Sequence, residues 1–216
     1  MPVPFCLPRF YPILDTAALA TRGADLRPAA EGLLEAGVKI LQYRHKAMWT
    51  QAHFDDAQKL ARACEETGTL FVLNDRADFA HILNAALHVG QDDLPPVAAR
   101  RVISDEVMGY STHNRLQLTR GNDEPVEYLS IGPIFATASK ERPDPVVGIR
   151  ALRELRPLTK KQLVGIGGIT LENALEVLDA KVDSVAVISG VLADKSDRKS
   201  VRKRAEEWLR VTAAET

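Results

Sequence analysis

The stretch that decides the fold runs from Val38 to Arg76 and reads VKILQYRHKAMWTQAHFDDAQKLARACEETGTLFVLNDR. Apolar runs at 38–43 and 70–73 flank an amphipathic segment at 50–67, which ends before Gly68. Apolar residues at three- and four-residue spacing indicate a helix, and glycine commonly follows a helix end. Strands that are apolar at consecutive positions are typical of a sheet covered on both faces. The stretch therefore predicts a β-α-β unit with parallel strands.

Strand-like runs of this kind recur along the whole chain. They are predicted at 11–14, 38–43, 70–73, 86–89, 107–110, 128–131, 163–166 and 184–188. Helix-like segments between them include 28–36, 50–67, 199–211, and 172–178 with Thr170 as its N-cap. Eight β-then-α repeats predict an α/β protein with a single (β/α)8 TIM barrel, and a doubly wound open sheet is the alternative. Because no linker divides the chain, residues 1–216 are interpreted as one domain.

Composition excludes several classes of protein. The 216 residues hold 28 Lys plus Arg and 29 Asp plus Glu, a net charge of -1, so the basic surplus of a sequence-independent nucleic-acid binder is missing. Two cysteines without a C-x-x-C pair argue against a disulfide scaffold or a thiolate zinc site. No apolar run approaches the roughly 20 residues of a membrane helix. We expect a cytoplasmic protein that binds neither nucleic acid nor membrane, and we leave a homo-oligomer open.

The active site of a TIM barrel lies at the carboxyl ends of its strands, where polar residues should therefore gather. Gln42, Arg44 and Lys46 alternate after the second strand and so share one side of an extended segment. Their amide, guanidinium and ammonium groups suit a phosphate or carboxylate ligand. A solvated strand end is the alternative for this segment taken alone.

Acids follow the third and fourth strands. Asp75 lies in an Asn-Asp-Arg sequence and Asp93 in a Gly-Gln-Asp-Asp sequence. Carboxylates at neighbouring strand ends, completed by substrate phosphate and water, are the ligands that Mg²⁺ prefers. The alternative interpretation is that these residues form turns or cap the next helices.

Hydroxyl groups and a histidine follow the fifth strand. We expect the hydroxyl of Ser111 or Thr112 to cap the next helix, and His113 to act as a structural hydrogen-bonding group rather than as a base. The chain holds no plausible cysteine nucleophile and no G-x-S-x-G elbow, so the sequence gives no support for covalent acyl chemistry.

The last three strands are followed by loops suited to anions. The long loop after the sixth strand carries Thr137, Ser139 and Lys140 and is interpreted as a mobile anion clamp. Gly168 and Ser189 follow the seventh and eighth strands, where barrels often bind phosphate through backbone N–H groups. The mouth thus has two predicted anion sites, which fit two phosphorylated substrates or one substrate phosphorylated at both ends.

Seven short motifs, in one order, carry a family resemblance over about residues 10 to 195. They are QYRHK at 42–46, LNDR at 73–76, HVGQDDLP at 88–95, GYSTH at 109–113, GPIFATASK at 132–140, GIGGI at 165–169 and VAVIS at 185–189. With these motifs the sequence resembles the thiamine-phosphate synthase (thiamine-phosphate pyrophosphorylase) family. The resemblance implies a Mg²⁺-dependent transferase of thiamine biosynthesis. It would join 4-amino-2-methyl-5-(diphosphooxymethyl)pyrimidine to a thiazole phosphate, giving thiamine monophosphate and pyrophosphate.

The resemblance also implies roles for residues at the matching positions. The pyrimidine diphosphate would be held by Gln42, Arg44, Lys46, Asn74, Ser111 and Lys140, of which Arg44, Lys46, Ser111 and Lys140 are the catalytic candidates. The metal would be held by Asp75 and Asp93, and the thiazole phosphate by Thr137, Ser139, Gly168, Ile188 and Ser189. A leaving diphosphate needs its growing charge neutralised, which Mg²⁺ and fixed cations supply, and no protein nucleophile is required.

Departures from the family pattern remove none of these ligands. The chain has NAALH at 84–88 and KVDS at 181–184 where the family commonly has A-D-G-V/I-H and G-A-D-G, and Ser139 replaces a common Thr. The nearest alternative is a homologous thiazole tautomerase of the same fold, and a more distant one is a non-catalytic barrel that binds a phosphorylated ligand. Retention of Arg44, Lys46 and Lys140 argues against the tautomerase, because an isomerase has no diphosphate to expel.

Overall fold

The structure, a computed structural model, describes residues 5–103, 105–137, 144–192 and 197–213. Its eight strands are all parallel and pair in chain order, and β8 pairs with β1 to close a barrel. The strands are β1 Phe10–Asp15, β2 Ile40–Arg44, β3 Leu70–Asn74, β4 Ala86–Val89, β5 Met108–Thr112, β6 Tyr128–Ile131, β7 Gln162–Ile166 and β8 Ser184–Val187. The chain is therefore a (β/α)8 TIM barrel as predicted, and the open-sheet alternative is wrong.

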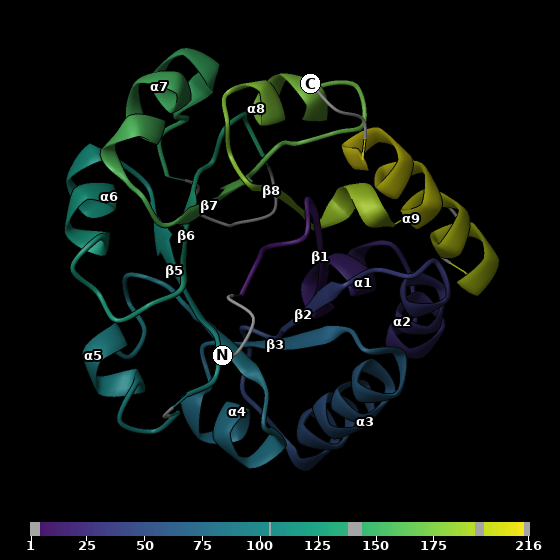
Figure 1. Cartoon of the computed structure of the whole chain (residues 1–216). Coiled ribbons are helices and arrows are strands. Elements are labelled where there is room, and N and C mark those ends of the chain that lie inside the picture. Colours follow the sequence, from purple (N-terminus) through teal and green to yellow (C-terminus); the bar gives the residue numbers. More distant parts are fainter. Residues whose placement is uncertain (1–4, 104, 138–143, 193–196, 214–216) are drawn as a thin grey trace.

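The helices surround the strands as an outer ring (Figure 1). They are α1 Thr16–Thr21, α2 Leu26–Glu35, α3 Gln51–Thr67, α4 Ala77–Leu83, α5 Pro96–Ala99, α6 Arg115–Gly121, α7 Gly148–Leu155, α8 Ala174–Asp179 and α9 Arg198–Ala213, with short 3₁₀ turns η1 Arg156–Leu158 and η2 Ser189–Val191. The larger apolar core lies between the ring and the strands. Among the described residues, no helix combines the length and the apolar character that crossing a membrane requires.

Helix α9 fastens the end of the described chain to its beginning. One face of this helix carries the buried residues Val201, Ala205 and Trp208. The Trp208 ring stacks on Phe10 of β1 with the ring centroids 5.4 Å apart. The indole Nε1 also donates a hydrogen bond to the Gly190 carbonyl at 3.0 Å. Gly32 of α2 allows α9 to pack closely, because a Cβ there would lie 2.5 Å from the Arg198 carbonyl oxygen. These contacts secure the β8 end, which forms part of the mouth.

The barrel interior is closed at the amino ends of the strands. Gln162, the first residue of β7, accepts a hydrogen bond from the Leu7 backbone N–H and donates one to the Phe5 carbonyl. The Leu7 side chain packs with a small interior cluster that includes Tyr11 and Tyr128. The segment before β1 therefore covers one end of the barrel and leaves the other end for a pocket.

Two predicted helix caps are wrong. Helix α8 begins at Ala174 with Asn173 in the N-cap position, so its N-cap is not Thr170. Helix α6 is capped by the Asn114 side chain rather than by the Ser111 or Thr112 hydroxyl. The reason is that β5 extends to Thr112, so both hydroxyls still belong to the sheet.

Candidate active site at the barrel mouth

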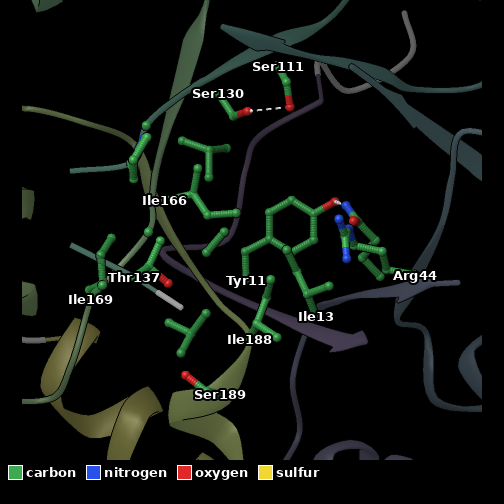
Figure 2. Close-up of a pocket in the computed structure, with 18 of the residues that line it drawn as sticks. Tyr11, Ile13, Arg44, Ser111, Ser130, Thr137, Ile166, Ile169, Ile188 and Ser189 are labelled. Carbon is green, nitrogen blue, oxygen red and sulfur yellow. Dashed lines mark hydrogen bonds between the residues drawn. The ribbon is translucent and has the colours of Figure 1, made fainter. Parts of the chain in front are cut away.

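A cavity of about 340 Å³ opens at the carboxyl ends of the strands (Figure 2). The predicted site residues that line it are Gln42, Arg44, Asn74, Ser111, Thr137, Gly168, Ile188 and Ser189. Eight predicted residues from six of the seven motifs therefore share one pocket, and the predicted residues Lys46, Asp75 and Asp93 lie outside its lining. Ser139 and Lys140, two further predictions, lie outside the described residues.

The strand register explains why these side chains meet. Ser111 of β5 pairs directly with Ser130 of β6, and their hydroxyl oxygens are 3.3 Å apart. Asn74 of β3 pairs in the same way with His88 of β4. Because side chains alternate between the two faces of a strand, residues at matched positions point into the barrel together. Polar residues at the last inward positions therefore form the floor of the mouth.

Arg44 is held in place by a neighbouring strand end. Its guanidinium pairs with the carboxylate of Asp15, which is buried at the end of β1 and lies opposite Arg44 in the sheet register. The second carboxylate oxygen of Asp15 accepts a hydrogen bond from the Ala18 N–H at 2.8 Å and so caps α1. A half-buried, paired guanidinium is well suited to bind an anion without a large ordering cost.

The second cation of this edge, Lys46, lies between the two predicted metal ligands. Its Nζ is 2.5 Å from Asp75 Oδ2 and 3.6 Å from Asp93 Oδ1. Burial, together with a hydrogen bond to Asp93, raises the pKa of Asp75 to about 6, although Lys46 opposes the shift. These contacts place one ammonium and two carboxylates in a single cluster.

The backbone conformation around the two acids fixes the direction of their carboxylates. Asp75 has a φ of +68°, a left-handed conformation that costs energy for most residues and is best tolerated by Asp and Asn. Asp93 is held by a 2.8 Å hydrogen bond from the Gly90 N–H to its Oδ2. Neither acid caps a helix, because Arg76 and Pro95 occupy the N-cap positions of α4 and α5. The capping interpretation is therefore wrong for both.

The donor set of this cluster fits Mg²⁺. It offers two hard carboxylate ligands. Among the described residues, no three or more His, Cys, Asp or Glu side chains come together as a metal site made of protein ligands alone. Mg²⁺ is commonly held by one or two carboxylates and takes its other ligands from phosphate and water. Beside the cluster, Asn74 is buried, and its Nδ2 has no hydrogen-bond partner within the described part of the chain. A buried donor without a partner in a pocket wall indicates a position for a ligand oxygen.

The glycine side of the mouth is built by two loops in close contact. The Phe135 N–H donates to the Gly167 carbonyl at 3.0 Å, which ties the loop after β6 to the loop after β7. Gly168 has a φ of +65°, and a Cβ there would lie 2.6 Å from the Ala136 carbonyl oxygen. Only glycine fits this position, and the resulting contact brings Thr137 to the pocket wall beside Gly168. Figure 2 shows Thr137, Ile188 and Ser189 away from the side where Ser111 and Ser130 lie.

His113 makes the structural hydrogen bond that the sequence predicts. Its Nδ1 is 2.7 Å from the Gly132 carbonyl oxygen and 3.5 Å from Asp144 Oδ2. The ring therefore joins the loop after β5 to the loop after β6. His113 also lines the pocket, so a direct role in catalysis stays untested.

Sequence reasoning missed several pocket residues. Tyr11, His88, Tyr128 and Ser130 all line the cavity. They lie within or at the end of apolar strand runs, and only the register of the closed barrel shows that they face inward. Asp15 was missed although it directly follows the first predicted strand, and the strand-end rule that selected Arg44 could have found it.

A closed (β/α)8 barrel with charged and polar side chains at its carboxyl-end pocket belongs to the class of barrels that work as enzymes at that end. A family model described as thiamine monophosphate synthase matches residues 10–191. The chain belongs to this thiamine monophosphate synthase family.

Individual relatives agree over nearly the full length. A thiamine-phosphate synthase of Koribacter versatilis is 47% identical over 209 residues, covering 95% of this chain and 96% of that protein. One from Chloroflexus aurantiacus is 35% identical, covering 86% of this chain and 85% of that protein. The solved thiamine phosphate pyrophosphorylase of Pyrococcus furiosus superposes with a TM-score of 0.82 at 28% identity, covering 94% and 95% of the two chains.

Proposed function

We propose that the chain joins 4-amino-2-methyl-5-(diphosphooxymethyl)pyrimidine to 4-methyl-5-(2-phosphoethyl)thiazole or to the carboxylated thiazole phosphate. The products are thiamine monophosphate and pyrophosphate, together with carbon dioxide when the thiazole is carboxylated. Family membership supports this reaction, and the observation that carries it is the division of one pocket into two sides. One side has Arg44 and Asn74, and the cluster of Lys46, Asp75 and Asp93 follows directly after Asn74, outside the pocket lining. The other side has a glycine turn with hydroxyl groups. A diphosphate and a monophosphate need different sites of these two kinds.

The diphosphate side uses charge to assist departure of pyrophosphate. Arg44 and Lys46 hold the diphosphate oxygens, together with Lys140 from outside the described residues. Asp75 and Asp93 would hold Mg²⁺, which when bound would neutralise charge on the leaving group. Lys46 contacts both carboxylates, so bound Mg²⁺ would take its place between them and the ammonium would turn to the diphosphate. Cations held against the leaving group stabilise its growing negative charge.

The monophosphate side positions the thiazole. The backbone at Gly168 and Ser189 and the hydroxyl of Thr137 would bind its phosphate, with Ser139 from outside the described residues. Ile188 and the neighbouring Ile166 give the pocket an apolar wall that excludes water from the reacting carbon. With both substrates held, the bond from the methylene carbon to diphosphate breaks first, the thiazole nitrogen then attacks that carbon, and proximity supplies much of the rate.

The alternative of a thiazole tautomerase is tested by the substrate requirement. The carboxylated thiazole phosphate tautomer is supplied alone, and again together with the pyrimidine diphosphate, while both thiazole phosphates and thiamine monophosphate are followed by chromatography. We expect consumption of the thiazole only when the pyrimidine diphosphate is present. Isomerisation of the thiazole alone, without thiamine monophosphate in the complete mixture, would reject the synthase proposal. Binding without conversion in either mixture would indicate a non-catalytic barrel.

The cytoplasmic location and a homo-oligomeric state stay predictions. The absence of nucleic acid among the partners is likewise a prediction from the near-neutral charge of the chain.

A further inference from the structure

A continuous chain of hydrogen-bonded side chains crosses the barrel interior beneath the mouth. Gln42 Nε2 donates to the Tyr11 hydroxyl at 2.7 Å, and the Tyr11 and Tyr128 hydroxyl oxygens are 2.9 Å apart. Tyr128 Oη is 3.1 Å from His88 Nδ1, and His88 Nε2 is 2.9 Å from Ser111 Oγ. The two ends of this internal chain, Gln42 and Ser111, both line the pocket.

Gly109 makes the central link of the internal chain possible. In the sheet register Gly109 of β5 lies between His88 of β4 and Tyr128 of β6. A Cβ on Gly109 would lie only 2.1 Å from Tyr128 Cζ, so the tyrosine ring occupies the space that a side chain would fill. The ring thereby crosses β5 and stacks on the His88 ring with centroids 5.6 Å apart. Tyr128 thus reaches a partner two strands away.

The hydroxyl groups of the internal chain remain protonated. Tyr11 and Tyr128 are fully buried, and burial raises the pKa of both phenols above the ordinary value. Each phenol therefore has a single hydrogen to donate. When each group in a row donates its one hydrogen to the next group, all hydrogen bonds in the row run in the same direction from donor to acceptor.

That direction follows from the Gln42 end. Gln42 donates to Tyr11, so Tyr11 donates to Tyr128, and Tyr128 donates to His88 Nδ1. A neutral imidazole that accepts at Nδ1 carries its hydrogen on Nε2, which then donates to Ser111 Oγ. The pocket therefore receives an acceptor from the Gln42 carbonyl oxygen. It also receives a donor from the Ser111 hydroxyl when the Ser111 hydrogen turns from Ser130 Oγ, 3.3 Å away, to a ligand.

We propose that Tyr128 is a positioning residue that fixes His88 in its Nε2-protonated form, and that it thereby sets Ser111 as a donor and Gln42 as an acceptor toward the substrate. This inference rests on the proposed function, because an aminopyrimidine presents an amino donor beside a ring nitrogen acceptor. The two ends of the internal chain match that pattern, and they are coupled through side chains that the reaction itself does not use.

The test compares Tyr128→Phe with Tyr43→Phe. Both changes remove one buried phenol oxygen, but the Tyr43 hydroxyl has no hydrogen-bond partner among the described residues. Loss of one or two buried hydrogen bonds predicts a roughly 10- to 100-fold fall in kcat/KM for the pyrimidine diphosphate in Tyr128→Phe. We expect an unchanged KM for the thiazole phosphate, and wild-type kinetics in Tyr43→Phe.

Nitrogen-15 NMR of the imidazole rings, measured on the protein without substrate, reports which nitrogen of His88 carries the hydrogen. We expect one Nε2-protonated form of His88 in the wild type and in Tyr43→Phe, and a mixture of tautomers in Tyr128→Phe. Tyr11→Phe breaks the same internal chain one link earlier. The double variant Tyr11→Phe/Tyr128→Phe should therefore be no less active than the less active of the two single variants.

Two results would overturn the inference. One is an Nδ1-protonated or mixed His88 in the wild type, and the other is a Tyr128→Phe protein with the tautomer and kinetics of Tyr43→Phe. A third result separates this inference from the proposed function. If His88 is a single Nε2-protonated tautomer in the wild type and a mixture in Tyr128→Phe, but the wild type makes no thiamine monophosphate, the proposed function has failed. The hydrogen-bonding role of Tyr128 would then still be supported.

Discussion

Asp75→Asn is expected to lower turnover by at least ~100-fold while leaving the fold intact. The change removes one negative charge from the carboxylate pair that faces Lys46. Losing one of two metal ligands costs about 3 kcal/mol or more of transition-state stabilisation, which corresponds to that factor. Asn tolerates the left-handed φ of +68° almost as well as Asp, so the loss reports on charge rather than on backbone strain.

The measurement is kcat as a function of Mg²⁺ concentration, with thermal unfolding to confirm the fold. Asp92→Ala is the matched control, because Asp92 is exposed and lies next to Asp93 without belonging to the cluster. We expect a higher Mg²⁺ requirement in Asp75→Asn and an unchanged curve in Asp92→Ala. A wild-type Mg²⁺ curve in Asp75→Asn would remove Asp75 from the metal site.

Gly168→Ala is expected to have the second largest effect. The new Cβ would lie 2.6 Å from the Ala136 carbonyl oxygen and 2.7 Å from Phe135 Cβ, so the two loops must separate. Separation displaces the backbone N–H groups proposed to bind the thiazole phosphate. Losing one or two hydrogen bonds to a charged group, at about 1.5–3 kcal/mol each, predicts a rise of roughly 10- to 100-fold or more in the KM for the thiazole phosphate.

Gly68→Ala separates this steric effect from backbone strain. Gly68 ends α3 with a φ of +63°, close to that of Gly168, but a Cβ there meets nothing within 4 Å. We expect Gly68→Ala to cost about 1 kcal/mol in the free energy of unfolding and to leave both KM values unchanged. Equal kinetic effects of the two substitutions would contradict a phosphate site at Gly168.

The barrel could be predicted from the sequence because its strands are continuous apolar runs with helices between them. Four of the eight predicted runs, those of β1, β2, β3 and β5, stop too early at the mouth, since they end at the last apolar residue. Strands β1, β2 and β3 each continue to a polar residue, namely Asp15, Arg44 and Asn74. Backbone pairing does not depend on side-chain polarity, so strands extend into the site while the apolar pattern ends.

The site could be predicted only where polar residues follow a strand. Tyr11 and Tyr128 fall inside apolar runs, where an aromatic residue indicates a strand and gives no sign of a role for its hydroxyl. Their contact depends on barrel closure and on the missing side chain of Gly109, which lies 19 residues before Tyr128. Such long-range packing cannot be read from local periodicity. The contacts of Lys46 with two acids likewise depend on three different strand ends meeting.

The most direct test of the account is the coupling reaction itself, measured with both substrates and the purified protein. Thiamine monophosphate and pyrophosphate are quantified together, first with a chelator present and then after addition of Mg²⁺. We predict equal amounts of the two products, formed only after Mg²⁺ is added and only when both substrates are present. Release of pyrophosphate without thiamine monophosphate, or coupling at the full rate in the chelator, would contradict a metal-assisted joining of two phosphorylated substrates in this pocket.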